Sequence, residues 1–194
     1  MPDLAEPSER SELSEPSDNR PLSPDSDISI RTELRPGDIG YVTYLHGHLY
    51  KEEYSYGIAF EAYVAMGLYE FYRQYDPAKD GVWVAEHGER IVGFLLLMHR
   101  EGNVAQLRYF ILEPAYRGMG LGKRLMELFM DRLREVGYTG AYLWTTHELG
   151  VAASLYVRHG FVLVEEKESD AFGKKLLEQK YEWVRAGPAP AEGQ

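Results

Sequence analysis

A glycine-dense turn between an apolar stretch and an amphipathic helix constrains this chain more than any other feature. Residues 107 to 126 read L-R-Y-F-I-L-E-P-A-Y-R-G-M-G-L-G-K-R-L-M, an apolar run that stops at Glu113-Pro114. Glycine allows the backbone to approach a ligand closely, and the first N–H groups of a helix have no partner within it. Together with the helix dipole and nearby cations, such groups favour a bound anion. The turn therefore predicts a diphosphate cradle, formed by Arg117, Gly118, Met119, Gly120, Leu121, Gly122, Lys123 and Arg124.

The spacing of these glycines distinguishes among diphosphate-binding motifs. A Walker A loop requires Ser or Thr after Gly-Lys, but Arg124 follows Gly122-Lys123. The dinucleotide fingerprint G-x-G-x-x-G fails because its third glycine would fall on Lys123 or Leu125. What remains is R-x-x-G-x-G at a junction between strand and helix. The alternative without a ligand is a glycine-rich turn with solvated basic side chains.

The composition excludes several kinds of site and partner. The 194 residues include no cysteine, so disulfides, thiolate metal ligands and a cysteine nucleophile are excluded. The net charge of −10 argues against nucleic acid, which would favour a basic surface. No apolar stretch reaches transmembrane length, and the N-terminus lacks the apolar core of a signal peptide. We therefore predict no membrane partner and a cytoplasmic location.

The chain divides into one domain with two loose ends. Residues 1–27 are acidic and rich in proline and serine, and they contain few apolar side chains. Such a composition predicts a disordered acidic tail. Residues 185–194 form a second disordered tail by the same argument. The remaining residues, 28–184, predict a single α/β domain.

Hydrophobic periodicity within this domain predicts a mixed sheet. An aromatic-rich helical pattern covers residues 39–75, and two later helical patterns lie after the glycine turn and at 151–159. The strand candidates are 28–31, 81–86, 91–99, 104–112, 140–145, 161–167 and 180–184. A crossover through the helix after the glycine turn should make strand 140–145 parallel to the strand before it. The prediction is an antiparallel meander followed by parallel strands, with helices on both faces and a ligand between diverging strands.

Two motifs resemble a known family. The R-x-x-G-x-G turn is similar to the acetyl-CoA signature of the GNAT acetyltransferase superfamily. The stretch from Ala152 to Phe161, A-A-S-L-Y-V-R-H-G-F, is similar to the superfamily pattern A-x-x-L-Y-x-x-x-G-F. The resemblance covers residues 28–184 and implies a GNAT-like sheet whose strands splay around acyl-CoA. Residues 46–54 and 172–179 resemble the acetyltransferase domain found fused to MarR-type regulators. Because residues 1–27 are too few for a winged helix, we expect the stand-alone version.

The resemblance implies acetyl-CoA as acyl donor and no metal. The pantetheine arm would pair with the backbone of Phe110, Ile111 and Leu112, and the diphosphate would lie on the glycine turn. An N–H group at Ile111 could polarise the thioester carbonyl. In the resembled pattern the tyrosine lies beside the thioester sulfur, so Tyr156 is the candidate acid for the leaving thiolate. The alternative for Tyr156 is a core aromatic on an amphipathic helix.

The acceptor side is less defined by the sequence. His46 and His147 are the candidate general bases, with Glu53 behind them, all expected on loops over the site. Each also has an ordinary explanation as a surface or core-edge residue. Nine tyrosines between residues 41 and 75 indicate an aromatic-lined amine site, with Tyr50 and Tyr54 as candidate acceptor contacts. Packing between helices is the alternative for most of these tyrosines.

The function predicted from these features is that of an N-acetyltransferase. It would move an acetyl group from acetyl-CoA to a primary amine, more readily of a small molecule than of a protein, by direct transfer in a ternary complex. The absence of cysteine agrees with direct transfer because no acyl-enzyme thiol is available. A homodimer is common in the resembled superfamily. The alternative from another class is a non-catalytic acyl-CoA-binding sensor or interaction module.

Overall fold

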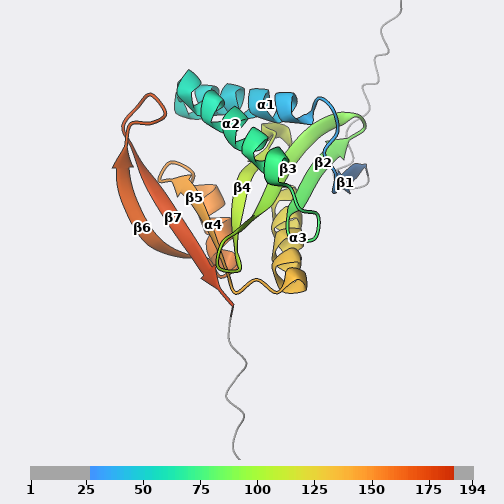
Figure 1. The fold of residues 1–194 in the computed structure, drawn as a ribbon. Coiled ribbons are helices and arrows are strands. Elements are labelled where there is room, and N and C mark those ends of the chain that lie inside the picture. Colours follow the sequence, from blue (N-terminus) through green and yellow to red (C-terminus); the bar gives the residue numbers. More distant parts are fainter. Residues whose placement is uncertain (1–26, 186–194) are drawn as a thin grey trace, which may run out of the picture.

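The computed structural model describes residues 27–185, which form one sheet with helices on both faces (Figure 1). The strands are β1 (Ile28–Arg31), β2 (Gly81–His87), β3 (Arg90–Arg100), β4 (Val104–Leu112), β5 (Gly140–Thr146), β6 (Val162–Ser169) and β7 (Leu176–Val184). The helices are α1 (Asp38–Tyr54), α2 (Ile58–Gln74), the short 3-10 helix η1 (Pro114–Tyr116), α3 (Leu121–Val136) and α4 (Gly150–Arg158). The predicted tails, apart from residues 27 and 185, lie outside the described residues.

The sheet has seven strands in the order β1-β2-β3-β4-β5-β7-β6. Every neighbouring pair is antiparallel except β4 and β5, which run parallel. The prediction of a mixed α/β sheet with an antiparallel meander is confirmed. Its parallel part consists of this one pair, because β7 returns between β5 and the edge strand β6.

The helical pattern predicted across residues 39–75 is divided in the structure. Ser55 adopts a left-handed conformation with φ of 59° and ends α1, and Gly57 is extended before α2 begins. The N–H of Gly57 donates a hydrogen bond of 2.9 Å to the carbonyl of Phe172, in the loop between β6 and β7. This contact joins the turn between the two helices to a distant loop, so the helical pattern at 39–75 corresponds to a helix pair.

The last strand begins four residues before its predicted start at Lys180. The residues from Leu176 to Gln179 include no β-branched side chain, so their intrinsic strand preference is weak. They are nevertheless paired on both sides: Glu178 lies opposite Thr146 in β5 and opposite Lys167 in β6. Pairing with two neighbours outweighs the local preference, and it brings Glu178 into the sheet.

Two apolar cores lie between the sheet and the helices on its two faces. Val64, Leu68 and Phe71 belong to the core that α1 and α2 form with one face of the sheet. The helices α3 and α4 form the second core with the other face, where Leu125 and Phe129 are fully buried. The central strand β3 contributes to both cores, which explains its nearly uninterrupted apolar sequence.

The two parallel strands separate after a short contact. Only Val104 to Gln106 of β4 pair with β5, through Gly140 to Tyr142. Beyond this point β4 shifts its register against β3, and Tyr109 takes a positive φ of 54°. Such a bulge bends a strand and increases its twist. The bend leaves a gap beside the second half of β4, directly before the glycine turn.

Candidate functional site

A cleft of about 930 Å³ opens where β4 leaves β5. We call it the donor cleft. Its walls are the end of α1, the end of β4, the glycine turn and α4. The predicted donor residues that line it are Phe110, Ile111, Leu112, Arg117, Gly118, Gly120, Gly122 and Lys123. The structure thus brings these predicted residues together around one open space.

Three predicted donor residues do not line this cleft. Leu121 is buried in the core beneath α3. Arg124 turns away, and its guanidinium donates a hydrogen bond of 3.3 Å to the carbonyl of Ile28. Met119 lies in the turn but is absent from the walls. The side chains of these three residues therefore do not line the cleft, whereas Gly118, Gly120 and Gly122 of the same turn do.

The backbone of the turn is shaped for a close approach by a ligand. Gly118 and Gly120 have φ values of 76° and 86°, which favour glycine, and Gly120 caps α3. A Cβ atom on Gly122 would lie 3.3 Å from Leu112 Cδ1. The N–H of Arg124 makes the first bond of α3 to the carbonyl of Gly120, 3.0 Å away. The preceding N–H groups stand before the first intrahelical bond and suit an anion.

The cations at the cleft already have acidic neighbours. The guanidinium of Arg117 donates to Glu53 Oε2 at 2.8 Å and to the carbonyl of Leu112 at 3.1 Å. The hydrogen bond to Glu53 raises the pKa of Arg117. Lys123 Nζ lies 3.5 Å from Glu127. Glu53, which the sequence places behind the two histidines as a candidate base, holds Arg117 against the edge of the cleft.

Successive residues of β4 direct their backbone N–H and C=O groups alternately towards β3 and towards the gap. The N–H of Glu113 donates to the carbonyl of Val92 in β3 at 2.9 Å. In an antiparallel pair the residues that exchange hydrogen bonds alternate, so Ile111 also directs its backbone towards β3. Phe110 and Leu112 direct theirs towards the gap. The polarising N–H expected at Ile111 is therefore better placed at Phe110 or Leu112.

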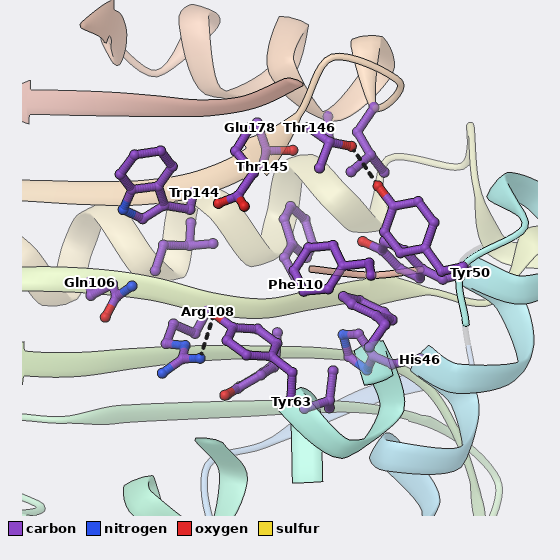
Figure 2. A pocket seen from close by; sticks show the side chains of 18 of the residues that line it. His46, Tyr50, Tyr63, Gln106, Arg108, Phe110, Trp144, Thr145, Thr146 and Glu178 are labelled. Carbon is purple, nitrogen blue, oxygen red and sulfur yellow. Dashed lines mark hydrogen bonds between the residues drawn. The ribbon is translucent and has the colours of Figure 1, made fainter. Parts of the chain in front are cut away.

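A second cavity, of about 140 Å³, adjoins the donor cleft (Figure 2). We call it the acceptor cavity. Side chains from α1, α2, β4, β5, α4, β7 and the loop between β6 and β7 line it. The two spaces share the lining residues Tyr50, Phe110, Leu149 and Ala152, which we call the throat. The two spaces therefore border on the same four residues.

Tyr156 lines the acceptor cavity from α4 and is only 5% exposed. Burial raises the pKa of Tyr156 well above its ordinary value, so the phenol keeps its proton at neutral pH. Tyr50 lies at the throat, where burial and the nearby Tyr156 raise its pKa in the same way. Tyr54 lines the donor cleft rather than the acceptor cavity. Of the two predicted acceptor tyrosines, only Tyr50 reaches the cavity.

The two candidate histidines lie in different surroundings. His46 lies within α1, not on a loop, and is 3% exposed on the wall of the acceptor cavity. Its Nδ1 donates to the carbonyl of Val42 at 2.8 Å, and burial lowers its pKa to about 4. His147 is exposed and lines neither space, and its Nδ1 accepts the N–H of Leu177 at 3.2 Å. His147 therefore lies away from the cavity that a base would serve.

Several cavity residues were not identified from the sequence. The additional side chains are Tyr56, Phe60, Tyr63, Arg108, Trp144, Thr146, Phe172 and Glu178. The hydroxyl groups of Tyr56 and Thr146 are 2.8 Å apart, and burial raises the pKa of Tyr56 to about 12. Arg108 could have been identified from the sequence, because it is the single charged residue in the apolar strand β4. Glu178 lies in the segment 172–179 that carried a family resemblance, but the predicted strand began only at Lys180 and gave Glu178 no role.

Within residues 27–185, no group of three or more His, Asp or Glu side chains is arranged to hold a metal ion. Within the same residues, no helix combines the length and apolar character needed to cross a membrane. The metal-free site, the cytoplasmic location and the homodimer remain predictions.

Comparisons by sequence place these features in a family. A model described as the Acetyltransferase (GNAT) family matches residues 46–161. The uncharacterized N-acetyltransferase YjgM of Escherichia coli (strain K12) is 35% identical over 97 residues, or 48% of this chain and 58% of that protein. N-acetyltransferase 8B of Rattus norvegicus is 37% identical over 87 residues, or 42% of this chain and 39% of that protein. The chain thus spans about half the length of the curated relatives it matches.

Comparisons by structure agree on the fold. An acetyltransferase from Streptococcus agalactiae 2603 superposes with a TM-score of 0.65 at 22% identity, covering 82% of this chain and 99% of the other. The structure of yncA from Salmonella typhimurium, solved with its cofactor acetyl-CoA, gives 0.63 at 16% identity, covering 87% and 100%. The resemblance to domains fused behind MarR-type regulators remains a prediction.

Proposed function

Because the chain belongs to the GNAT family of acetyltransferases, we propose that it transfers an acetyl group from acetyl-CoA to a primary amine of a small molecule. The observation that carries this proposal is the throat. There the donor cleft and the acceptor cavity meet beside Tyr156. Separate spaces for donor and acceptor suit direct transfer in a ternary complex, because both substrates can be bound together.

The donor is accommodated by backbone groups and two cations. The diphosphate is held by the N–H groups at the start of α3, with Lys123 and Arg117 adding positive charge. The pantetheine arm runs along the gap beside β4, where Phe110 and Leu112 offer their peptide groups as an additional strand would require. The acetyl-CoA bound in the yncA structure supports this choice of donor.

The chemistry requires a polarised carbonyl, a neutral amine and a proton for the thiolate. A backbone N–H at Phe110, at the throat, polarises the carbonyl. As the C–N bond forms and the C–S bond breaks, the protonated Tyr156 donates its proton to the sulfur, and the proton that leaves the amine nitrogen restores the phenol. Of the predicted bases only His46 lines the acceptor cavity. Its low pKa makes it a weak base, so we expect the amine to react in its neutral form.

Release of CoA from acetyl-CoA tests this proposal across amino acids, polyamines, aminoglycosides and lysine peptides. We expect release that depends on the amine. Replacing Tyr156 by Phe should lower kcat about 100-fold or more, since positioned acids contribute factors of that order. The affinity for acetyl-CoA should stay nearly unchanged.

The matched control is Tyr181→Phe. Tyr181 is a buried neighbour whose ring centroid lies 6.2 Å from that of Tyr156, and it lines neither space. We expect this variant to keep its kcat. Equal loss of turnover and acetyl-CoA affinity in Tyr156→Phe would give that residue a structural role. Tight acetyl-CoA binding with no amine-dependent release would favour the non-catalytic sensor.

A further inference from the structure

The acceptor cavity is largely aromatic, but two charged side chains line it. Arg108 comes from β4 and Glu178 from β7, and Figure 2 shows them on opposite sides of the space. The other ionisable nitrogen group on the wall, His46, is buried with its pKa lowered to about 4, so it is neutral at physiological pH. The formal charges of the cavity are therefore one cation facing one anion.

The guanidinium of Arg108 is held in place but incompletely paired. It lies over the rings of Tyr109 and Tyr63, at 4.7 Å and 5.3 Å from their centroids. Its side chain is only 10% exposed, and its short hydrogen bond goes to the neutral hydroxyl of Tyr63 at 2.9 Å. The carboxylate of Glu70 is 3.6 Å away and half exposed. Arginine has five N–H donors, so this group retains capacity for a carboxylate ligand.

Glu178 provides the opposite charge on the part of the cavity wall that β7 contributes. It pairs in register with Thr146 at the end of β5, and its side chain is 16% exposed. Its partner outside the cavity is Lys167, whose Nζ is 3.3 Å from Glu178 Oε2 and which is itself half exposed. A carboxylate in this position suits the ammonium form of an incoming amine.

We propose that the acceptor is an amino acid, with its carboxylate bound by Arg108 and its amino group drawn towards Glu178 and the throat. The proposal rests on the acetyltransferase function proposed above and names its substrate class. The rings of Phe60, Tyr63 and Phe172 on the same cavity wall would receive an apolar side chain. In this arrangement each charged end of the zwitterion faces a side chain of opposite charge: the carboxylate faces Arg108 and the ammonium group faces Glu178.

The same charges disfavour the other amines. A polyamine would bring a second ammonium group into the cavity beside the guanidinium of Arg108, and like charges in a desolvated site repel. An amine without a carboxylate would leave Arg108 incompletely paired. A site built around a charged partner discriminates strongly against ligands that lack it.

Kinetics with matched substrates test the proposal. For one side chain, kcat/KM is measured with phenylalanine, phenylalaninamide and phenethylamine, and the series is repeated with leucine, leucinamide and isoamylamine. We expect the acid to exceed the amide and the amine by about 10-fold or more, because a charged, buried pair is lost. The amide has the less basic amine and so more of the neutral form, and amine basicity therefore works against the expected preference.

The variant Arg108→Gln should remove this preference selectively. We expect about a 100-fold loss of kcat/KM for the acid and a change within about threefold for the amide, since only the acid uses the guanidinium. Glu178→Gln should lower kcat/KM for all three substrates to a similar extent, because each of them carries an amino group that can bind as the ammonium form. Retained acetyl-CoA affinity and an unchanged melting temperature show that each variant is folded.

Two matched controls separate the cavity from its surroundings. Arg100→Gln removes a neighbouring cation that shares Glu70 with Arg108 but lies outside the cavity wall. Lys167→Gln removes the external partner of Glu178 while leaving its carboxylate. We expect both to keep the preference for the acid. Equal use of acid, amide and amine by the wild-type protein, a preference for polyamines, or equal losses in Arg108→Gln would overturn the proposal.

Calorimetry distinguishes failure of this inference from failure of the proposed function. The amino acid is titrated into wild-type and Arg108→Gln protein saturated with CoA. Binding that depends on Arg108, without turnover of any amine, would refute the enzyme but support the zwitterion site. Turnover of amines with no dependence on Arg108 would support the enzyme and refute the amino acid as its acceptor. Absence of both turnover and binding would refute both.

Discussion

The donor cleft and the acceptor cavity meet at one throat, but they are built in different ways. The donor residues between Phe110 and Lys123 follow one another along the chain, and α1 and α4 complete the cleft. The acceptor cavity is assembled from segments spread along the chain from α1 to β7, among them the loop carrying Phe172 and the strand carrying Glu178. The family model spans residues 46–161, which include the whole lining of the donor cleft but neither of those two residues. The donor site is thus part of the shared family region, whereas a portion of the acceptor site lies beyond it.

The largest expected effect is a loss of turnover when the throat is blocked, with binding of CoA largely retained. Ala152 lines both spaces from α4, and Ala152→Trp would fill the region where they join. We expect turnover to fall about 1000-fold, because misplacing reacting groups by an ångström already costs a factor near 100. Binding of CoA, held mainly at the glycine turn, should weaken less than about 10-fold by the same positional argument. Steady-state kinetics and calorimetry measure the two quantities.

The matched control places the same side chain elsewhere on α4. Val157 is 56% exposed and lines neither space, so Val157→Trp should keep both turnover and CoA affinity. Parallel losses of binding and turnover in Ala152→Trp would mean that the throat is not a boundary between separate sites.

Acid stability should reveal how dry the acceptor cavity is. Burial lowers the pKa of His46 from 6.5 to about 4. Between these two pH values the unfolded chain therefore binds a proton at His46 that the folded protein does not bind. The associated stability is complete above pH 6.5 and is lost as the pH falls towards 4, amounting to no more than about 3 kcal/mol. Denaturant unfolding of wild-type protein and His46→Gln across this range should show a shallower pH dependence in the variant. Identical slopes would mean that His46 is hydrated.

The smallest expected effect concerns the glycine turn. Gly118 and Gly102 both have a φ of 76°, and a Cβ at either would meet nothing within 4 Å. Alanine at each position should therefore cost a similar backbone strain, of about 1 kcal/mol. Only Gly118 lines the donor cleft, so only Gly118→Ala should weaken acetyl-CoA binding, by about 10-fold as the turn shifts to relieve that strain. Equal affinities in the two variants would indicate that the turn does not contact the donor.

The sequence could predict what depends on neighbouring residues. The glycine spacing, the cations around it and the bend after β4 are local features, and they identified the turn and most of its lining. Tyr156 was identified because a local pattern ends at Gly160-Phe161, and the structure buries it on the wall of the acceptor cavity. These features require no knowledge of which distant segments pack together.

The acceptor side depends on tertiary contacts that no local pattern reveals. Glu178 enters the sheet only because β7 pairs with two neighbours, since Leu176 to Gln179 have weak strand preference. Phe172 reaches the cavity because its carbonyl accepts the N–H of Gly57. His46 and His147 looked alike as candidate bases, but helix packing buried the first and strand β7 engaged the second. Burial and register therefore decided the roles that residue type left open.

Initial-velocity kinetics with both substrates varied test most directly the claim that donor and acceptor are held together across the throat. Direct transfer predicts that double-reciprocal plots against acetyl-CoA, at several fixed amine concentrations, intersect. It also predicts that acetyl-CoA alone yields no stoichiometric burst of CoA. Parallel lines, or a burst of CoA before any amine is added, would indicate a covalent acetyl-enzyme and would contradict direct transfer.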